Sequence, residues 1–150
     1  MKDDTLPPDT NKSYSQKSVG ERFTNILPAY GDLQVVEVYF YYDGPKLFSL
    51  YSKTKDTYFL VFMVADEDKE GEESETFLYL PLSPKDFESA TNGKRDLYDS
   101  FKMSKTGTVW AVTYNYSISY DFPSIEEKAV NSISKDWLPY PGAFLGDEPE

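Results

Sequence analysis

Apolar and polar residues alternate along much of the chain with the period of two that is typical of β-strands. In Leu33–Tyr42 (LQVVEVYFYY), every second residue from Val36 onward is apolar or aromatic, so one face of this segment is expected to be buried. Tyr58–Ala65 (YFLVFMVA) is apolar or aromatic at every position, which predicts a central strand covered on both faces. The same pattern predicts strands over Lys46–Lys53, Thr76–Leu82 and Thr108–Tyr120.

A hairpin turn is expected where Asp43-Gly44-Pro45 separates the first two strands. Asp-Gly favours a tight turn because glycine accepts positive φ and Asp tolerates it. Pro45 cannot donate a ladder hydrogen bond and suits the first residue of a strand. The alternative is that Asp43 is a catalytic carboxylate paired with Glu37 or Asp96, but turn formation already explains each of the three residues.

Three segments carry helix signals. Ser83-Pro84 resembles an N-cap followed by proline at the first helical position, and Asn92-Gly93 is a typical helix stop. Asp96–Met103 is expected to add a second helical turn. Ser124–Glu127 has the spacing of a capping box, which predicts a helix whose apolar side carries Ile125, Ala129, Val130 and Ile133.

Both ends of the chain differ from the part between them. Residues 1–20 are polar and contain prolines, which predicts a disordered leader, and Glu21–Ala29 is expected to form a short helix or turn. Asp136–Leu145 is too proline-rich for a helix or inner strand, so we expect an extended segment that wraps the body, anchored by Trp137, Leu138 and Phe144. The expected organisation is a leader at 1–20, one domain at 21–145 and an acidic tail at 146–150.

Together these elements predict an α+β fold. We expect an antiparallel meander of five or six strands with two or three short helices packed on one side. A length of 150 residues suits one domain with a sizeable core.

The net charge of -11 is concentrated in a few short segments. Half of the 26 acidic residues lie near the two chain ends and in Asp66–Glu75, where only Lys2 and Lys69 of the 15 basic residues accompany them. The remaining chain is formally neutral. A nucleic-acid decoy would need acids at regular intervals along a face, and direct nucleic-acid binding would need a basic stripe beyond the isolated Lys94-Arg95 pair. The charge pattern therefore favours neither.

Histidine and cysteine are both missing from the sequence. Ser-His-Asp and Cys-His catalysis, disulfide bonds, and metal sites built on imidazole or thiolate are therefore excluded. An enzyme would have to rely on Asp, Glu, Lys, Tyr or Ser, and the sequence contains no Gly-rich phosphate loop. We therefore expect a protein without enzymatic activity, cofactor or metal.

The acidic segment Asp66–Phe77 (DEDKEGEESETF) resembles the start of a calcium-binding loop, with acids at positions one, three and five and glycine at position six. Position twelve, where a bidentate Glu is needed, is Phe77. The flanking segments are also expected to be strands rather than helices. A solvated hairpin loop, whose charge prevents sheet edges from pairing, is the better interpretation, and weak nonspecific cation binding is a further option.

Aromatic residues could contact a partner. The 13 tyrosines could form a stacking platform for bases, but such platforms come with cationic grooves, so packing in the core or an interface is the better interpretation. Trp137–Pro141 could close the core or dock on another protein, since Trp and Tyr are enriched at binding hot spots. The residues expected to contact a partner are Tyr41, Asp43, Glu70, Glu72, Glu73, Trp137 and Tyr140.

Several short motifs occur in a fixed order along the chain: Glu37–Ser49 with Tyr-Asp-Gly-Pro-x-Leu-Phe-Ser, Tyr79–Ser83 after the acidic segment, Gly93 with Asp96-Leu97 and Phe101, and the terminal Leu138-Pro139, Gly142 and Leu145. In these motifs the chain resembles a family of small, uncharacterised bacterial domains of unknown function. The resemblance implies a bacterial or phage origin and no particular reaction.

The sequence thus predicts a non-enzymatic protein that binds or regulates another protein, as an accessory, immunity or inhibitor component. One alternative is an acidic nucleic-acid mimic that blocks a DNA- or RNA-binding protein. Another is a carboxylate-based hydrolase or small-molecule binder. Neither a membrane span nor the apolar core of a signal peptide is found in the sequence, so we expect a cytoplasmic location and no membrane partner.

Overall fold

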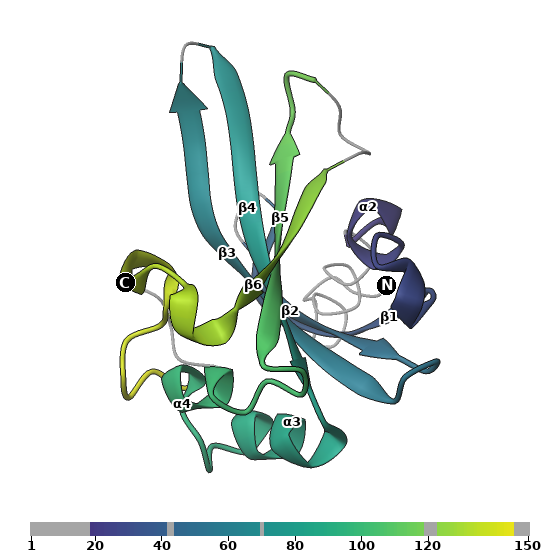
Figure 1. Cartoon of the computed structure of the whole chain (residues 1–150), viewed down its shortest axis with the longest axis vertical. Coiled ribbons are helices and arrows are strands. Elements are labelled where there is room, and N and C mark those ends of the chain that lie inside the picture. Colours follow the sequence, from purple (N-terminus) through teal and green to yellow (C-terminus); the bar gives the residue numbers. More distant parts are fainter. Residues whose placement is uncertain (1–18, 42–43, 70, 119–122, 146–150) are drawn as a thin grey trace, which may run out of the picture.

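The computed structural model describes residues 19–41, 44–69, 71–118 and 123–145. Their centre is an antiparallel sheet of six strands, in which each strand pairs with the next one along the chain (Figure 1). The predicted α+β class and meander are therefore confirmed. The strands are β1 (Leu33–Tyr41), β2 (Pro45–Ser52), β3 (Thr57–Lys69), β4 (Glu72–Leu82), β5 (Thr108–Asn115) and β6 (Ser124–Ala129).

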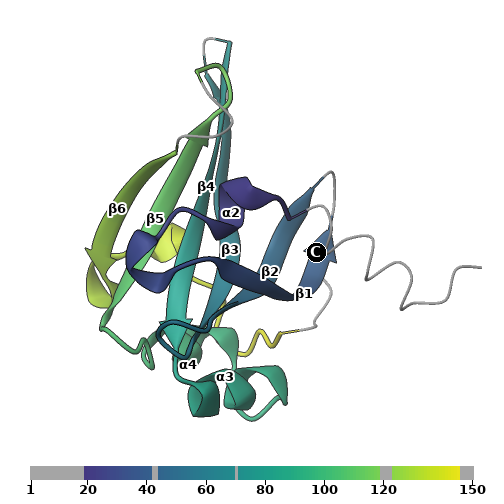
Figure 2. The ribbon, with the colours of Figure 1, turned by 90° about the vertical axis from the view of Figure 1, so that its right-hand side faces the viewer.

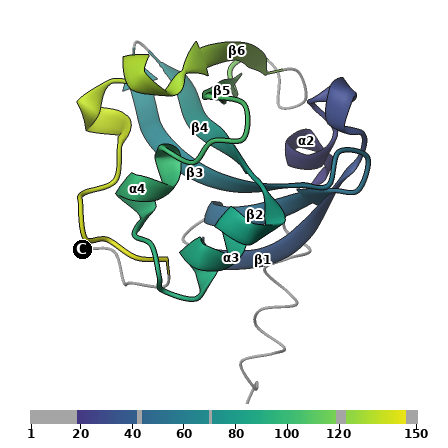
Figure 3. The same cartoon turned by 60° about the horizontal axis from the view of Figure 1, so that its bottom comes forward.

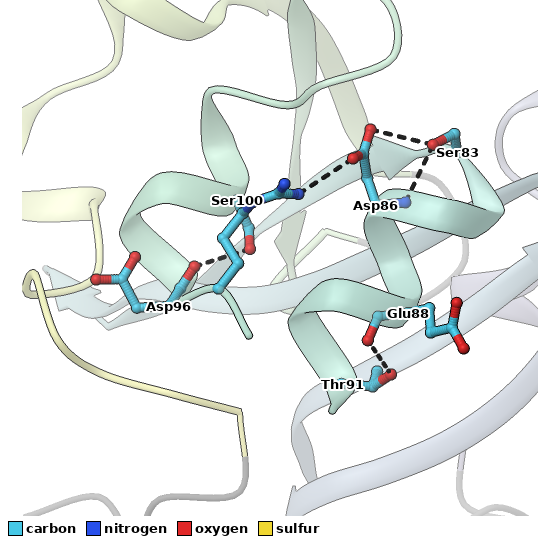
Figure 4. A network of polar contacts seen from close by, with 7 residues as sticks. Ser83, Asp86, Glu88, Thr91, Asp96 and Ser100 are labelled. Carbon is cyan, nitrogen blue, oxygen red and sulfur yellow. Dashed lines mark hydrogen bonds and ion pairs between the residues drawn. The ribbon is translucent and has the colours of Figure 1, made fainter. Parts of the chain in front are cut away.

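The two longest helices begin as the sequence predicts. In α3 (Pro84–Thr91) the hydroxyl of Ser83 accepts a hydrogen bond from the backbone N–H of Asp86 at 3.2 Å (Figure 4). Asp96 caps α4 (Leu97–Phe101) in the same manner. No helix in the described ranges is long and apolar enough to cross a bilayer. The shorter elements are α2 (Glu21–Thr24) and the 3-10 turns η1 (Pro28–Tyr30), η2 (Val130–Ser132) and η3 (Lys135–Trp137).

Both faces of the sheet are buried, because successive residues of β3 point into two separate hydrophobic clusters. Phe59 and Val61 belong to the first cluster, which the segment 19–32 closes with Phe23 at its centre. Leu60 and Phe62 belong to the second cluster, which α3, α4 and the C-terminal segment close (Figures 2 and 3).

The short helices consequently lie on both faces of the sheet, which corrects the expectation that they share one side. α2 covers the first cluster, whereas α3 and α4 cover the second. The reason is visible in Tyr58–Ala65: a strand that is apolar on both faces needs a cover on each.

The predicted helix at Ser124–Glu127 is wrong, because these residues begin strand β6. All six residues of β6 pair with β5 in one unbroken register, from Ser124 opposite Thr113 to Ala129 opposite Thr108. A capping box favours a helix only through its first turn. Pairing along β5 satisfies more backbone groups than one isolated turn would, so the tertiary contact overrides the local signal.

The expected hairpin loop in the acidic segment is also wrong, because most of it is strand. β3 continues to Lys69 and β4 begins at Glu72, so the register runs on from Met63–Phe77 to Lys69–Glu72. This extension projects away from α3 and α4 (Figure 1). We call it the acidic arm and define it as Ala65–Lys69 of β3 and Glu72–Glu75 of β4.

The C-terminal segment packs against the second cluster, as predicted, but it is not extended throughout, because Lys135–Trp137 form η3 and residues 141–142 form a turn. Trp137, Leu138 and Leu145 contact that cluster, whereas the ring of Phe144 is 36% exposed. A hydrogen bond from the N–H of Gly142 to the Asp96 carboxylate, 2.7 Å long, ties the segment to the start of α4.

Candidate functional site

The acidic arm places carboxylates directly opposite one another. Asp66 faces Glu75 and Asp68 faces Glu73, and residues that face one another in an antiparallel pair lie on the same side of the sheet. Both pairs therefore share the face that carries Phe77 and the first cluster. Like charges in such positions destabilise a hairpin unless a cation neutralises them, so these two pairs in themselves oppose the folding of the arm.

One edge of the arm has no described strand beside it. The pairing of β3 with β2 ends at Phe62 opposite Leu47, whereas the pairing with β4 continues to Lys69. The opposite edge of the arm is covered, because β5 follows β4 as far as Asn115 opposite Ser74. The open side of β3 is consequently a strand edge flanked by carboxylates.

A half-buried polar network holds the base of the arm. The Glu75 carboxylate accepts a hydrogen bond from the Tyr116 hydroxyl at 2.6 Å and forms an ion pair with Lys46 at 2.9 Å. The side chains of Lys46 and Glu75 are only 14% and 16% exposed. Arg22 donates to the Tyr116 hydroxyl at 2.7 Å, so the network reaches from β2 across β4 to α2. The base of the arm is thus fixed to the body.

Two buried tyrosines fix the N-terminal segment that carries Arg22. The hydroxyl of Tyr79 donates to the backbone carbonyl of Phe23 at 2.8 Å, and the hydroxyl of Tyr114 donates to the carbonyl of Arg22. The Arg22 guanidinium lies 5.2 Å and 5.3 Å from the ring centres of Tyr114 and Tyr116, within the range of cation–π attraction. Segment 19–32 is therefore held to the sheet by polar contacts as well as by the Phe23 side chain.

The surroundings of these tyrosines favour their neutral forms. Burial, followed by the hydrogen bond to Glu75, raises the pKa of Tyr116 to about 12. Burial likewise raises the pKa values of Tyr79 and Tyr114 above the usual value. Their hydroxyl groups remain hydrogen-bond donors at neutral pH.

The residues predicted from sequence to contact a partner lie on separate elements. Glu72 and Glu73 are exposed on the acidic arm, Tyr41 ends β1, and Trp137 and Tyr140 lie in the C-terminal segment. Trp137 is half-buried against the second cluster, whereas Tyr140 is 85% exposed. The predictions for Asp43 and Glu70 lie outside the described residues.

The sequence reasoning missed the residues at the base of the arm. Lys46, Glu75 and Tyr116 each continue the alternation of a core-facing row, set by Phe48, Phe77 and Tyr114. A charged residue in phase with a buried row indicates a buried ion pair or network, and this signal was present. Arg22 gave no such signal, because its position depends on how α2 crosses the sheet.

The described ranges contain no cluster of side chains that could hold a metal ion. No group of three or more acidic side chains there is placed to hold a metal ion. The resemblance to a calcium loop fails because Asp66 and Asp68, at positions one and three, lie in the extended strand β3 and not in a loop that curves around an ion.

A model of a family of unknown function, DUF6575, matches residues 24–149. The chain belongs to this family. The DUF6575 match includes the acidic arm together with Lys46, Glu75 and Tyr116, and it begins just after Arg22. Neither a search of curated proteins nor a search of solved structures finds a match. The predicted membership in a family of unknown function is thus confirmed.

Proposed function

We propose that this DUF6575 protein is a non-enzymatic protein-binding module, in which the acidic arm binds a basic, extended segment of a partner protein. The observation that carries the proposal is that carboxylates face one another in two rungs of the arm, Asp66–Glu75 and Asp68–Glu73, of which Glu75 is neutralised within the chain by Lys46. The rung Asp68–Glu73 opposes folding, so its retention in the hairpin calls for a gain elsewhere. A cationic partner supplies that gain by neutralising carboxylates on adjacent rungs.

The fixed base supports the same function. Lys46, Tyr116 and Arg22 hold Glu75 in place through contacts of 2.9 Å or less between successive members. An arm held in its binding geometry loses less conformational entropy when a partner binds than a mobile loop would. Binding strength can then come from few contacts.

The open edge of β3 suggests how the partner binds. An extended segment can add to a sheet edge through backbone hydrogen bonds, while side chains alternate between the faces. On this edge, Asp66 and Asp68 would favour Lys or Arg in the added strand and would repel the same edge of another copy. A role as an accessory, immunity or inhibitor component of a bacterium or phage belongs to the same proposal.

The test uses calorimetric titration with a synthetic peptide of alternating lysine and valine. The triple variant Asp66→Asn, Asp68→Asn, Glu73→Gln removes three charges and leaves Glu75 and its network intact. We expect it to bind the peptide about tenfold more weakly, because exposed ion pairs contribute roughly 0.2–1 kcal/mol each.

The matched control removes three exposed charges outside the arm, with Asp32→Asn, Glu88→Gln and Asp136→Asn. This variant should bind the peptide as the wild type does. Equal weakening in both variants would show that only net charge matters. A wild-type protein that fails to bind the peptide would contradict the proposal directly.

A second candidate is the acidic nucleic-acid mimic. The strand structure of the arm favours it, because a strand spaces carboxylates regularly along one face and a loop does not. Asp66 and Asp68 recur on one face about 6.8 Å apart, from the rise of about 3.4 Å per residue in an antiparallel strand. Competition separates the two functions: duplex DNA or RNA should displace the protein from the target of a mimic, and should not compete for a partner that binds as a β-strand.

A further inference from the structure

The two outer edges of the sheet differ in regularity. β1 pairs only with β2, and its register shifts at three places between Val35 and Tyr41. Such bulges twist an edge strand and discourage further pairing. β6 pairs only with β5, and its register has no shift from Ser124 to Ala129. β6, at the outer side of the sheet in Figure 2, is therefore a regular edge.

The backbone groups that β6 presents outward can be identified. In an antiparallel pair, residues that exchange hydrogen bonds with the facing strand alternate with residues whose N–H and C=O point away. Val130 donates from its backbone N–H to Gly107 at 3.0 Å, in the same register as β5 and β6. Val130 therefore faces β5, as does every second residue before it in β6. The residues between them, Ile125, Glu127 and Ala129, direct their backbone N–H and C=O groups outward.

We propose that β6 pairs antiparallel with β6 of a second copy of this chain, about a two-fold axis at Glu127, so that the two sheets become one. This register aligns the outward groups: Ile125 faces Ala129 of the second copy, and Glu127 faces its own equivalent. It also sets Glu126 opposite Lys128 twice. The inference does not depend on the function of the acidic arm.

More than one register matches the outward N–H and C=O groups of the two β6 strands, and the charged side chains favour the axis at Glu127. An axis at Glu126 would also match outward groups, but it would place Glu126 against Glu126 and Lys128 against Ser124. The axis at Glu127 instead extends an existing ion pair, since Lys128 lies 3.3 Å from Glu126 within the chain. On the face of the sheet that carries Glu126 and Lys128, charges of opposite sign then lie across the interface from one another.

Two further contacts follow from this register, one unfavourable and one favourable. Glu127 meets a like charge on the axis, and its carboxylate is drawn toward β5 by a hydrogen bond from the Thr108 hydroxyl at 3.0 Å. Ile125, which is 41% exposed, gains an apolar neighbour in Ala129. One strand edge is a small interface, so the dimer should form reversibly and depend on protein concentration.

The test uses sedimentation equilibrium of the full chain over a wide concentration range. The wild type should shift from one chain to two as concentration rises. Glu126→Lys and Lys128→Glu should each weaken this dimer about tenfold or more, because each turns both opposite-charge pairs into like-charge pairs. A mixture of the two variants should restore a dimer that contains one chain of each.

The matched control swaps Asp99 and Lys102, an exposed ion pair of α4 at 3.5 Å. Asp99→Lys and Lys102→Glu should each dimerise as the wild type does, and a mixture of the two variants should contain no more dimer than either variant alone. Glu127→Gln should strengthen the dimer several-fold, since it removes the like-charge contact on the axis. A wild type that remains a single chain throughout, or a mixture of the Glu126 and Lys128 variants that stays unpaired, would overturn the proposal.

Discussion

The guanidinium of Arg22 donates a hydrogen bond to the hydroxyl of Tyr116, which is 94 residues away in the chain. Through Tyr116 it is connected to Glu75, so the N-terminal segment and the acidic arm share one network. The network is half-buried, and each polar group in it depends on the next one for a partner. It therefore couples two parts of the molecule that no single strand pairing joins.

Removal of one oxygen should break this connection. Tyr116→Phe retains the ring and leaves Glu75 with Lys46, but it removes the acceptor for Arg22 and the donor to Glu75. We expect a loss of about 1–3 kcal/mol in the free energy of unfolding, measured by urea denaturation. Tyr140→Phe is the control, because the hydroxyl of an 85% exposed ring should contribute almost nothing. Equal stability of the two variants would mean that the network has no energetic role.

The junction between the N-terminal segment and β1 requires glycine for two separate reasons. Gly31 has φ +71°, and a Cβ at this position would lie 2.6 Å from the hydroxyl oxygen of Thr54. Gly107 has a similar φ of +75° with open space around it. Backbone strain alone should therefore lower the free energy of unfolding of Gly107→Ala by about 1–2 kcal/mol. The free energy of unfolding of Gly31→Ala should fall further, because the clash with Thr54 is added to the strain.

A double variant separates the two contributions. Thr54→Ala removes the clashing oxygen. The double variant Gly31→Ala, Thr54→Ala should therefore lose only the part of the free energy of unfolding that is due to backbone strain. Thermal unfolding of the three variants measures this directly. If Thr54→Ala gave no recovery, close approach would not be the reason for glycine at this position.

Asp96 serves two elements with different oxygens. Oδ1 accepts from the N–H of Asp99 and caps α4, whereas Oδ2 accepts from the N–H of Gly142 in the C-terminal segment. In Asp96→Asn the remaining carbonyl oxygen can still cap α4, but the new amide group cannot accept from Gly142. We expect faster amide hydrogen exchange at Gly142 and unchanged exchange in α4. Loss of protection in both places would show that the two roles cannot be separated.

The parts of the fold that the sequence predicts are those with strong local patterns. The alternation in Leu33–Tyr42, the apolar run in Thr76–Leu82 and the Ser83-Pro84 cap lead to β1, β4 and α3, respectively. The errors occur where a neighbouring strand decides the conformation. Ser124–Ala129 becomes a strand because the edge of β5 is available, and the acidic residues become strands because the apolar parts of β3 and β4 set a register that continues outward.

The candidate site was only partly predictable for the same reason. Glu72 and Glu73 could be named from charge alone. The rungs Asp66–Glu75 and Asp68–Glu73 depend on the register, including its shift between Met63 and Ala65, which no local pattern determines.

Alkaline pH should destabilise the fold through its buried tyrosines. Burial raises the pKa of Tyr39 to about 12, and Tyr116 has a similar value. Because these folded-state pKa values exceed the usual 10.0, the contribution to stability is complete below about pH 10 and is lost as pH rises toward about 12. The free energy of unfolding of Tyr39→Phe should fall less steeply over this range than that of the wild type. Ionisation of all tyrosines near pH 10 in the folded protein would contradict this expectation.

Replacing an acidic residue of the arm should raise the free energy of unfolding and weaken peptide binding. Asp68→Lys converts the contact with Glu73 from repulsion to attraction, so the free energy of unfolding should rise by about 0.5–1.5 kcal/mol. The same change places a positive charge beside the open edge of β3, so the lysine–valine peptide should bind more weakly. Asp32→Lys, an equal charge change at an exposed position outside the arm, should leave both quantities nearly unchanged. If Asp68→Lys were stabilised and still bound the peptide as the wild type does, the repulsion between Asp68 and Glu73 would be unrelated to peptide binding. The facing carboxylates would then need another explanation.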